Sequence, residues 1–361
     1  MHHQPLLTII ITSYNHADYI KQAITSFLNQ TFTDFEILII DDKSCDNSVE
    51  IIKSFHDSRI KLIELDVNRG ICNASNLGIK NARGKYIKLF ASDDIALPTI
   101  LEKQIHFLEK NPSYDAVFSG IEVIDDNENL LPKKTKKFEK FFTNINRSKE
   151  EWLNHFFFKG NCLATPTMMA RKELLQKIDG LDGRLSQAHD FNMWVKFCIH
   201  GSNIFVINEK LVQYRRRINN KNMSSNTSNV RARLVFDNEK ILQNFLVIDD
   251  VKILVKIFPN LAEIESKITK NLIPFFIAQE ALKANSCHHK QFAISVLYDL
   301  LSNHEICNIL ETQFNFKINR DFYNIVSDNP LGTMLEIVQQ KPLYRRLLRS
   351  LGNIIFSKRA S

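Results

Sequence analysis

The chain has 361 residues, 44% of them hydrophobic, which is enough for two domains with sizeable cores and excludes a chain disordered throughout. Its formal net charge of +7 predicts anionic partners such as nucleotides, acidic lipids or nucleic acid, without choosing among them. The six cysteines form no CxxC pair, which excludes a zinc site of the usual spacing and is typical of reduced thiols in a cytosolic protein.

Strand and helix patterns alternate four times along residues 6–110. Continuous apolar runs at 6–12, 35–40, 60–65 and 86–90 predict buried strands. Apolar residues at helical spacing follow each run, at 19–28, 49–55, 71–82 and 100–108. This order predicts an α/β fold with a mainly parallel sheet and helices on both faces. Glycine-rich dinucleotide and P-loop motifs are excluded, because TSYNHAD after the first strand has no glycine.

Polar side chains follow three of these strands at the point where each strand ends. Tyr14 and Asn15 follow the first strand, Asp42 the second, and Asp93 and Asp94 the fourth. Open α/β sheets bind their ligands at this carboxyl edge. Two adjacent carboxylates repel each other, which predicts a divalent cation beside them, shared with a diphosphate. Each residue also has a local explanation: a solvated turn or helix cap for the carboxylates, and packing on the first helix for Tyr14.

Three segments carry a resemblance to a known family. PLLTIIITSYN, FEILIIDDKSCDNS and NRGICNASNLGIKNARGKYIKLFASDD, in this order, resemble the nucleotide-binding half of a family 2 glycosyltransferase with the GT-A fold. The resemblance runs through the first two-fifths of the chain and resumes near Asp190 and Tyr214. It implies a Rossmann-like catalytic domain over residues 1–225, which we expect to be followed by an all-helical domain over 226–340.

The resemblance also implies roles for the residues at the strand ends. Nucleotide binding would involve Thr12, Tyr14, Asn15, Asp42 and Asp93. Tyr14 would stack on the base, Asp42 would accept a hydrogen bond from a pyrimidine N–H, and Asp93 would contact the ribose. Asp94 would bind the Mn²⁺ or Mg²⁺ that bridges the diphosphate of a nucleotide sugar, expected to be a UDP-sugar.

Two positions depart from the pattern of the family. Ala91 replaces the first carboxylate of the usual Asp-x-Asp-Asp run, and Ser75 stands where many members carry arginine. The first departure leaves the strictness of metal dependence open, and the second leaves the donor sugar open. Because of these two departures, the alternative is a protein that binds nucleotide sugars without catalysis.

Asp190 lies just before a predicted helix that contains Phe191 to Cys198. The resemblance implies that it is the general base of an inverting enzyme, which takes the proton of the acceptor hydroxyl. Shielding by Trp194 and Leu185 would raise its pKa toward a useful range. The alternative is that Asp190 only caps the helix. His189 stands where an acidic residue often precedes the base, and we expect it to be a partly buried histidine with a backbone partner.

The segment VQYRRRINNKNMSS, residues 212–225, resembles the YRxHxxxxS segment of the family, with Arg217 where histidine is common. One of the three successive arginines, with Arg215 and Arg217 as the candidates, is expected to contact phosphate from a lid that orders when the donor binds. The alternative is that Arg215 and Arg216 point to solvent. The basic segment 132–140 is expected to be a solvated surface loop.

Beyond residue 226 the pattern predicts helices without strands and carries no catalytic motif. The expected helices cover 234–246, 250–258, 261–284, 292–301 and 306–313. Residues 341–361 hold six basic and no acidic residues, which predicts an amphipathic helix on an anionic membrane surface, or one packed on its own domain or on a second subunit. A nucleic-acid partner is not expected, because no recognised binding module is present.

These observations predict an inverting, metal-dependent glycosyltransferase. It would move a sugar from a UDP-sugar to a hydroxyl of a bacterial surface glycan, such as lipo-oligosaccharide, O-antigen or capsule, on a glycan or lipid-linked acceptor. We expect a cytoplasmic protein with peripheral contact to the inner face of the plasma membrane. Neither a signal peptide nor an apolar run of the ~18 residues that span a bilayer is expected.

Overall fold

The computed structural model describes residues 4–131, 136–142, 145–217, 222 and 227–328. By its contacts this part of the chain divides into two compact units. The first unit comprises residues up to 248 together with 252–260, and the second comprises 249–251 and the residues from 261 onward. Residues 227–248, which the sequence assigned to a helical second domain, therefore belong to the first unit.

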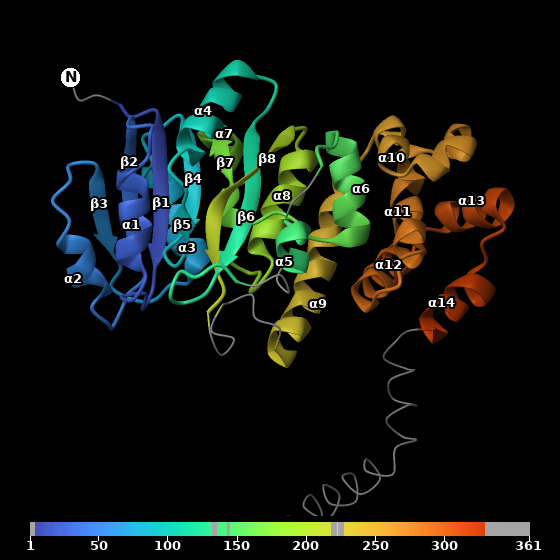
Figure 1. Ribbon diagram of the computed structural model, residues 1–361. Coiled ribbons are helices and arrows are strands. Elements are labelled where there is room, and N and C mark those ends of the chain that lie inside the picture. Colours follow the sequence, from blue (N-terminus) through green and yellow to red (C-terminus); the bar gives the residue numbers. More distant parts are fainter. Residues whose placement is uncertain (1–3, 132–135, 143–144, 218–221, 223–226, 329–361) are drawn as a thin grey trace, which may run out of the picture. The chain divides into compact units, whose positions relative to one another are not determined.

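The first unit is built on one mixed sheet of eight strands (Figure 1). These strands are β1 (Leu7–Ser13), β2 (Phe35–Asp41), β3 (Ile60–Glu64), β4 (Tyr86–Ala91), β5 (Ile95–Ala96), β6 (Ala116–Ile124), β7 (Met169–Arg171) and β8 (Ile204–Arg215). Its helices are α1 (Ile20–Leu28), α2 (Ser48–Lys53), α3 (Ile71–Asn81), α4 (Ile100–Lys110), α5 (Lys136–Phe141), α6 (Lys149–Lys159), η2 (Thr165–Thr167), α7 (Lys172–Lys177), α8 (His189–Ile199), α9 (Ser228–Leu242) and η4 (Gln243–Val247).

The strand order across the sheet is β3-β2-β1-β4-β7-β6-β8-β5. The first four strands run parallel, with β1 between β2 and β4, and β3 beside β2. Strand β7 pairs antiparallel with both β4 and β6, so the sheet becomes mixed beyond β4. The predicted α/β fold is confirmed, and the first four strands and their helices lie where the apolar patterns placed them.

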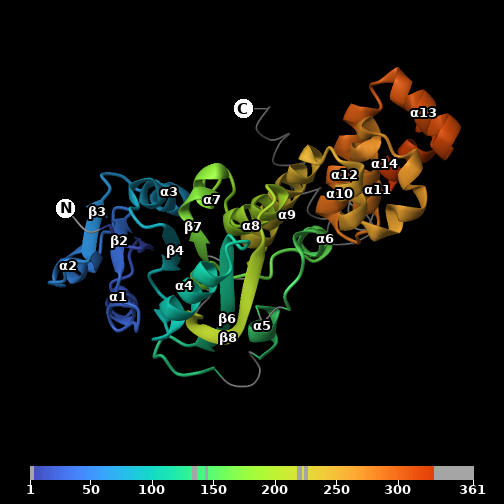
Figure 2. The ribbon, with the colours of Figure 1, turned by 90° about the horizontal axis from the view of Figure 1, so that it is seen from above.

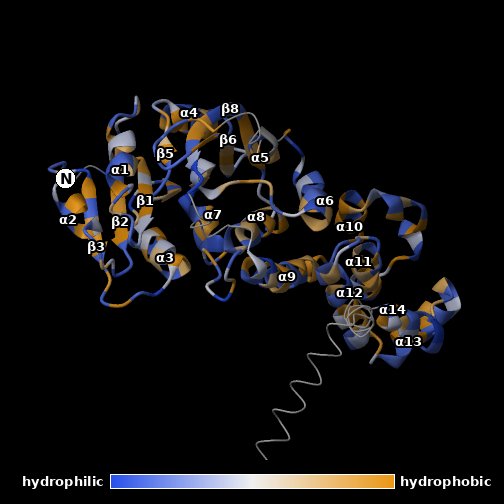
Figure 3. Cartoon of the chain, turned by 60° about the horizontal axis from the view of Figure 1, so that its bottom comes forward, coloured by the Kyte–Doolittle hydropathy of each residue, from blue (hydrophilic) through white to orange (hydrophobic). Residues whose placement is uncertain are grey.

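Helices cover both faces of this sheet (Figure 2). Helices α1 and α4 lie on one side, and α3 and α7 lie on the other. Strands β1 and β2 are therefore buried almost throughout, which is why their sequences are continuous apolar runs rather than alternating ones. Strands β1, β2 and β3 are largely orange, the colour of apolar residues, in Figure 3.

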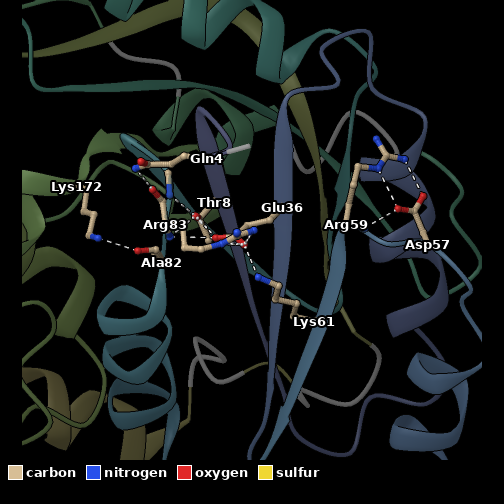
Figure 4. Close-up of polar contacts among 10 residues, drawn as sticks. Gln4, Thr8, Glu36, Asp57, Arg59, Lys61, Ala82, Arg83 and Lys172 are labelled. Atoms are coloured by element: carbon tan, nitrogen blue, oxygen red, sulfur yellow. Dashed lines mark hydrogen bonds and ion pairs between the residues drawn. The ribbon is translucent and has the colours of Figure 1, made fainter. Parts of the chain in front are cut away.

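A buried carboxylate ties the strands together at their amino ends (Figure 4). Glu36 of β2 is 4% exposed, and its Oε1 accepts hydrogen bonds from Thr8 Oγ1 at 2.9 Å and from the Arg83 N–H at 3.0 Å. Its Oε2 accepts from Arg83 Nε at 2.8 Å and from Lys61 Nζ at 3.1 Å. Burial alone would raise the pKa of Glu36, but the hydrogen bonds from Arg83 and its neighbours lower it. This group lies opposite the carboxyl edge of the sheet.

Some predicted segments differ from the structure. Residues 136–141 form α5 where a loop was expected, and 132–135 lie outside the described residues. Residues 212–215 of the expected lid end strand β8, and of the remainder only Arg216, Arg217 and Asn222 are described. The single helix expected over 261–284 is wrong: η5 (Pro259–Lys267), η6 (Lys270–Leu272) and α11 (Ile273–Leu282) replace it. Pro274 lies in the first turn of α11, where its missing N–H costs no hydrogen bond.

Helices make up the described part of the second unit. Helix α10 (Val251–Ile257) belongs to the first unit except for its first residue. Beyond η5, η6 and α11 come α12 (Cys287–Leu300), α13 (His304–Phe314), the π-helix η7 (Ile318–Phe322) and α14 (Tyr323–Ser327). Within residues 4–328, setting the gaps aside, no helix is long and apolar enough to cross a bilayer. The basic tail predicted at 341–361 lies outside the described residues.

Candidate active site

The loops after β1 and β2 hold each other at the carboxyl edge of the sheet. Asn15 adopts a left-handed conformation, with φ of 53°. Its N–H donates to Ser44 Oγ at 3.0 Å, and its Oδ1 accepts from the Cys45 N–H at 2.8 Å. Between β1 and Asn15, Tyr14 is 45% exposed, so its ring is not packed away on α1. Thr12, inside β1, is half-buried.

Asp42 holds the start of α3. Its carboxylate is 4% exposed and accepts the N–H of Arg69 at 2.7 Å and the N–H of Gly70 at 2.8 Å, one on each oxygen. Gly70 has a φ of 82°, a backbone conformation that favours glycine, and directly precedes α3. Asp42 is therefore not the cap of α2, whose N-cap is Asn47. Each carboxylate oxygen keeps a second lone pair that a ligand N–H can use.

Asp94 is a buried carboxylate and not part of a solvated turn. It is 2% exposed, and its Oδ1 accepts the Arg215 N–H at 2.8 Å. Burial and the neighbouring charge of Asp93 raise the pKa of Asp94 well above its usual range. Helix α4 has Thr99 as its N-cap, so neither Asp93 nor Asp94 caps it.

Arg215 supports the site from within. Its side chain is fully buried, and Nε donates to the Asp93 carbonyl at 2.8 Å. Nη1 donates to the carbonyls of Asp125 at 2.9 Å and Asp126 at 3.1 Å, and Nη2 donates to Gln22 Oε1 at 3.0 Å. Arg215 therefore does not point to solvent, and four of its five guanidinium donors bond backbone and amide oxygens. A phosphate contact from Arg215 stays a prediction.

Arg217 keeps a guanidinium donor that has no partner among the described residues. Its Nη1 lies 3.0 Å from His16 Nε2, and its guanidinium lies 5.0 Å from the centre of the Tyr19 ring. Within the described part of the chain, its buried Nε has no hydrogen-bond partner. Since arginine only donates, His16 Nε2 accepts, and Nδ1 carries the proton donated to Ser92 Oγ at 2.6 Å. Burial lowers the pKa of His16, which favours this neutral form.

Asp190 lies in the first turn of α8 among hydrogen-bond donors. Its Oδ1 accepts the Phe191 N–H at 2.6 Å, and its Oδ2 accepts from Thr165 Oγ1 at 3.2 Å. Asn161 Nδ2 lies 3.4 Å from both oxygens. Burial raises the pKa of Asp190, although the donors around it oppose the shift. The N-cap of α8 is Ala188, so Asp190 is not merely the cap of that helix.

Helix α3 connects the two groups of residues. No hydrogen bond joins Asp190 to Asp93 or Asp94 in the described structure. However, Cys72, the second residue of α3, has a buried thiol whose pKa is raised to about 12, first by burial and then by nearby carboxylates that include Asp190. Asp190 is therefore close enough to the amino end of α3 for its charge to act on Cys72. Asp42 bonds the backbone at this same end of the helix.

Lys88 provides a second connection, from the middle of β4. Its side chain is fully buried, and Nζ donates to Gln104 Oε1 at 3.2 Å and to the carbonyls of Pro166 at 3.0 Å and Met168 at 3.4 Å. Burial keeps the pKa of Lys88 well below its usual range. Strand β4, which leads into Asp93, is thus bonded to the segment that carries Thr165, a partner of Asp190.

Comparison with known proteins identifies the family. The model of glycosyl transferase family 2 matches residues 8–178. An uncharacterized glycosyltransferase of Methanocaldococcus jannaschii is 34% identical over 216 residues, which cover 59% of this chain and 71% of the relative. The chain belongs to glycosyl transferase family 2. It is a glycosyltransferase, as the sequence predicted.

Other relatives of this family 2 glycosyltransferase are more distant or only partly covered. The Escherichia coli UDP-Glc:alpha-D-GlcNAc-diphosphoundecaprenol beta-1,3-glucosyltransferase WfgD is 38% identical over 122 residues, which cover 34% of this chain and 48% of WfgD. The structure of S. aureus TarS 1–349 with UDP-GlcNAc matches with a TM-score of 0.56 at 17% identity, covering 88% of this chain and 89% of TarS 1–349.

A second solved structure has the same fold. The mannosyltransferase PcManGT of Pyrobaculum calidifontis, in complex with GDP-Man and Mn²⁺, matches with a TM-score of 0.52 at 14% identity, covering 91% of this chain and 88% of PcManGT. At these identities the two solved structures support the GT-A fold of this glycosyltransferase.

A metal centre made of protein ligands alone is absent from the described part of this glycosyltransferase. There, no three or more histidine, cysteine, aspartate or glutamate side chains gather closely enough to hold an ion. Asp93 and Asp94 offer adjacent hard oxygen ligands, and a diphosphate and water would have to complete the coordination. Asp94 fits such a role, because a cation would favour the charged form that burial disfavours.

Several residues of the site were not singled out from the sequence. They are His16, Asn161 and Thr165. His16 has a weak signal, its place just after Tyr14 and Asn15 at the strand end. Asn161 and Thr165 have none, because they reach Asp190 only through the tertiary fold.

Proposed function

We propose that this glycosyltransferase transfers a sugar, with inversion, from a UDP-linked donor to a hydroxyl of a bacterial surface glycan or of its lipid-linked precursor. The observation that carries the proposal is the half-buried Asp190, whose pKa is raised, within electrostatic reach of the end of α3 that Asp42 holds. A UDP-sugar is supported by the TarS complex with UDP-GlcNAc and by the UDP-Glc in the name of WfgD. The same name supports a lipid-linked acceptor.

In the proposed reaction the acceptor hydroxyl oxygen attacks the anomeric carbon from the face opposite the diphosphate. The bond from the anomeric carbon to the diphosphate oxygen breaks in the same displacement, and Asp190 takes the hydroxyl proton. A carboxylate with a raised pKa is a better proton acceptor than an exposed one, which suits this role. Thr165 and Asn161 would keep the carboxylate ionised and oriented.

The nucleotide would bind along the loops after β1 and β2. In this proposal the exposed ring of Tyr14 stacks on the base, and Asp42 uses a remaining lone pair for the pyrimidine N–H. Asp93 contacts the ribose. Thr12 and Asn15 complete the pocket, and the bonds of Asn15 to Ser44 and Cys45 keep it in shape.

The diphosphate would lie beside Asp94 and Arg217. Asp94, with Asp93, would hold Mn²⁺ or Mg²⁺, which offsets the charge that builds on the leaving diphosphate. The Mn²⁺ in the PcManGT complex supports this choice of metal. The buried Nε of Arg217, without a partner among the described residues, is the donor we assign to a phosphate oxygen.

The proposed setting is the cytoplasm, with residues 341–361 in contact with an anionic inner membrane surface. The basic composition of that segment supports it, because six basic residues attract acidic lipid headgroups. Such contact would bring the enzyme to a lipid-linked acceptor.

The test compares Asp190→Asn with wild type and with Glu173→Gln, an exposed carboxylate on α7. Loss of a general base lowers the transfer rate by about 10²–10⁴-fold, whereas UDP affinity in the presence of Mn²⁺, measured by calorimetry, stays within about threefold. Glu173→Gln is expected to keep both the transfer rate and the UDP affinity of wild type. If wild type binds UDP with Mn²⁺ yet neither transfers nor hydrolyses any donor across a broad panel, the non-catalytic alternative is correct.

A further inference from the structure

Asp237 is a buried carboxylate on α9, beyond the residues that the family model matches. It is fully buried, and its Oδ2 accepts the N–H of Gln187 at 2.7 Å and the N–H of Ala188 at 3.0 Å. Its Oδ1 has no hydrogen-bond partner in the part of the chain that the structure describes. Burying a carboxylate in this way is costly, so the two bonds to the backbone must offset much of that cost.

Both N–H groups belong to the residues that lead into α8. The N-cap of α8 is Ala188, which has no side-chain acceptor of its own. The first turn of any helix leaves N–H groups without partners, and a local serine, threonine or aspartate normally satisfies them. Gln187 and Ala188 precede that turn, so Asp237 does not replace such a cap. It fixes instead the backbone from which α8 begins, from a helix 49 residues further along the chain.

The segment formed by α9 and η4, called here the α9–η4 arm, makes a second contact with α8, on the other side of Asp190. Asn244, in η4 directly after α9, donates from Nδ2 to Asn192 Oδ1 at 2.8 Å. Asn192 is 4% exposed, so water does not compete strongly for this bond. The α9–η4 arm therefore fixes the chain both before and after Asp190.

Asp237 and Asp190 also act on a common neighbour. The Cys72 thiol at the start of α3 experiences the charges of both carboxylates. Asp237 and Asp190 are thus both close enough to the start of α3 for their charges to raise the pKa of Cys72.

We propose that Asp237 is a positioning residue, which fixes the direction of Asp190 toward the acceptor hydroxyl by holding the backbone of Gln187 and Ala188. The inference rests on the proposed function, because it assigns Asp190 the role of base. Proton transfer requires the base within hydrogen-bond reach of the hydroxyl, and a displacement of about 1 Å can cost on the order of 10²-fold in rate.

The experiment compares Asp237→Ala, Asp237→Asn and Glu239→Ala in the full chain. Asparagine keeps an oxygen that can accept the two N–H groups, whereas alanine removes it. Glu239 is a matched control, since it is a carboxylate on the same helix that pairs with Lys240 and Gln243 instead of the α8 loop. Turnover is measured as UDP release from UDP-glucose and from UDP-GlcNAc with Mn²⁺. Hydrogen exchange of the peptide that covers residues 186–190 reports on the loop itself.

Asp237→Ala is expected to lower kcat by about 10–100-fold with the donor KM within about threefold, and to speed exchange in 186–190. Asp237→Asn and Glu239→Ala are expected to stay near wild type in both measurements. Unchanged kcat and unchanged exchange in Asp237→Ala overturn the proposal, as does an equal loss of kcat in the alanine and asparagine variants. If Asp237→Ala does not fold, Asp237→Ser takes its place, because its hydroxyl is shorter than the carboxylate arm.

The exchange measurement separates this inference from the proposed function. If wild type releases no UDP from either donor, the proposed function is in doubt for those donors, and exchange alone decides whether Asp237 anchors the loop. Faster exchange in the alanine variant then supports the anchor, and unchanged exchange overturns it.

Discussion

The carboxylate of Asp190 is half-buried, and its pKa depends on the hydrogen-bond donors that surround it. Burial raises this pKa, while the hydrogen bond from Thr165 lowers it by favouring the ionised form. A general base works only when ionised, so the rate must fall as pH drops through the pKa of Asp190. Since that pKa is raised, the acidic limb lies above the value of about 3.9 of an ordinary aspartate.

Thr165→Val is expected to move this limb to higher pH. The substitution removes one donor to the carboxylate, so the ionised form is less favoured and the pKa rises further. The measurement is kcat/KM between about pH 4 and 9, whose limbs report the pKa values of the free enzyme. Thr167→Val is the control, because its hydroxyl donates to the Ala164 carbonyl instead. A limb unmoved in Thr165→Val contradicts the role of Asp190 as base.

Arg217 and Arg215 are expected to give opposite results when each is replaced by alanine. Arg217→Ala removes the proposed phosphate donor and weakens UDP binding by about 10–100-fold, because a bond to a charged group contributes about 1.5–3 kcal/mol. Uridine, which has no phosphate, binds both proteins equally. Equal weakening of UDP and uridine binding contradicts the phosphate contact.

Arg215→Ala is expected to destabilise the fold instead. It leaves the carbonyls of Asp93, Asp125 and Asp126 without their buried donor, and each unsatisfied group costs about 1–3 kcal/mol. Urea unfolding measures this as a drop of about 3 kcal/mol or more in the free energy of unfolding. A variant with wild-type stability would show that these bonds are dispensable.

Among the elements, the amino ends of β1, β2 and β3 are joined by Glu36 and its partners. Glu36→Gln is expected to lower the free energy of unfolding by about 2 kcal/mol at neutral pH, because hydrogen bonds to a charged acceptor are stronger than those to an amide. The folded-state pKa of Glu36 is lowered, so its contribution is present above its unfolded value of 4.5 and is lost as pH falls through the folded value.

Urea titrations at neutral and acidic pH test this dependence. The difference between wild type and Glu36→Gln is expected to shrink as the carboxylate is protonated. Glu64→Gln is the control, because its partner Lys53 and Glu64 itself are 57% and 47% exposed and such pairs contribute little. A difference that stays constant with pH contradicts the ionic nature of the contribution.

At the scale of the whole molecule, the proposed membrane contact depends on the basic segment 341–361. Its deletion is expected to release the protein from vesicles of anionic phosphatidylglycerol, because about 1 kcal/mol of attraction is lost with each basic residue near the surface. Vesicles of neutral phosphatidylcholine are the control and bind both proteins weakly. Co-sedimentation measures the bound fraction, and an unchanged fraction after deletion rules out this contact.

The sequence by itself determined the alternating strands and helices of residues 7–110, which are β1 to β4 with α1 to α4. Buried parallel strands must be apolar on both faces, and helices must place apolar residues on one side, so short-range periodicity was enough. The same logic located the polar residues at the carboxyl edge, including Asp42, Asp93 and Asp94. Strand β8 was missed, because its middle is exposed and lacks a continuous apolar run.

Only the tertiary structure decided what the charged side chains contact. The backbone N–H of Arg215 donates to the Asp94 carboxylate, and its buried side chain donates to the Asp93 carbonyl. These bonds join groups 121 and 122 residues apart, and no local pattern shows that the arginine turns inward. Asp237 had a weak signal, a carboxylate in step with Leu234 and Ile241 on a predicted helix, but its partners are backbone N–H groups about 50 residues away. A hydrogen bond depends on where two groups meet in space, and the sequence fixes that meeting only through the packing of the whole fold.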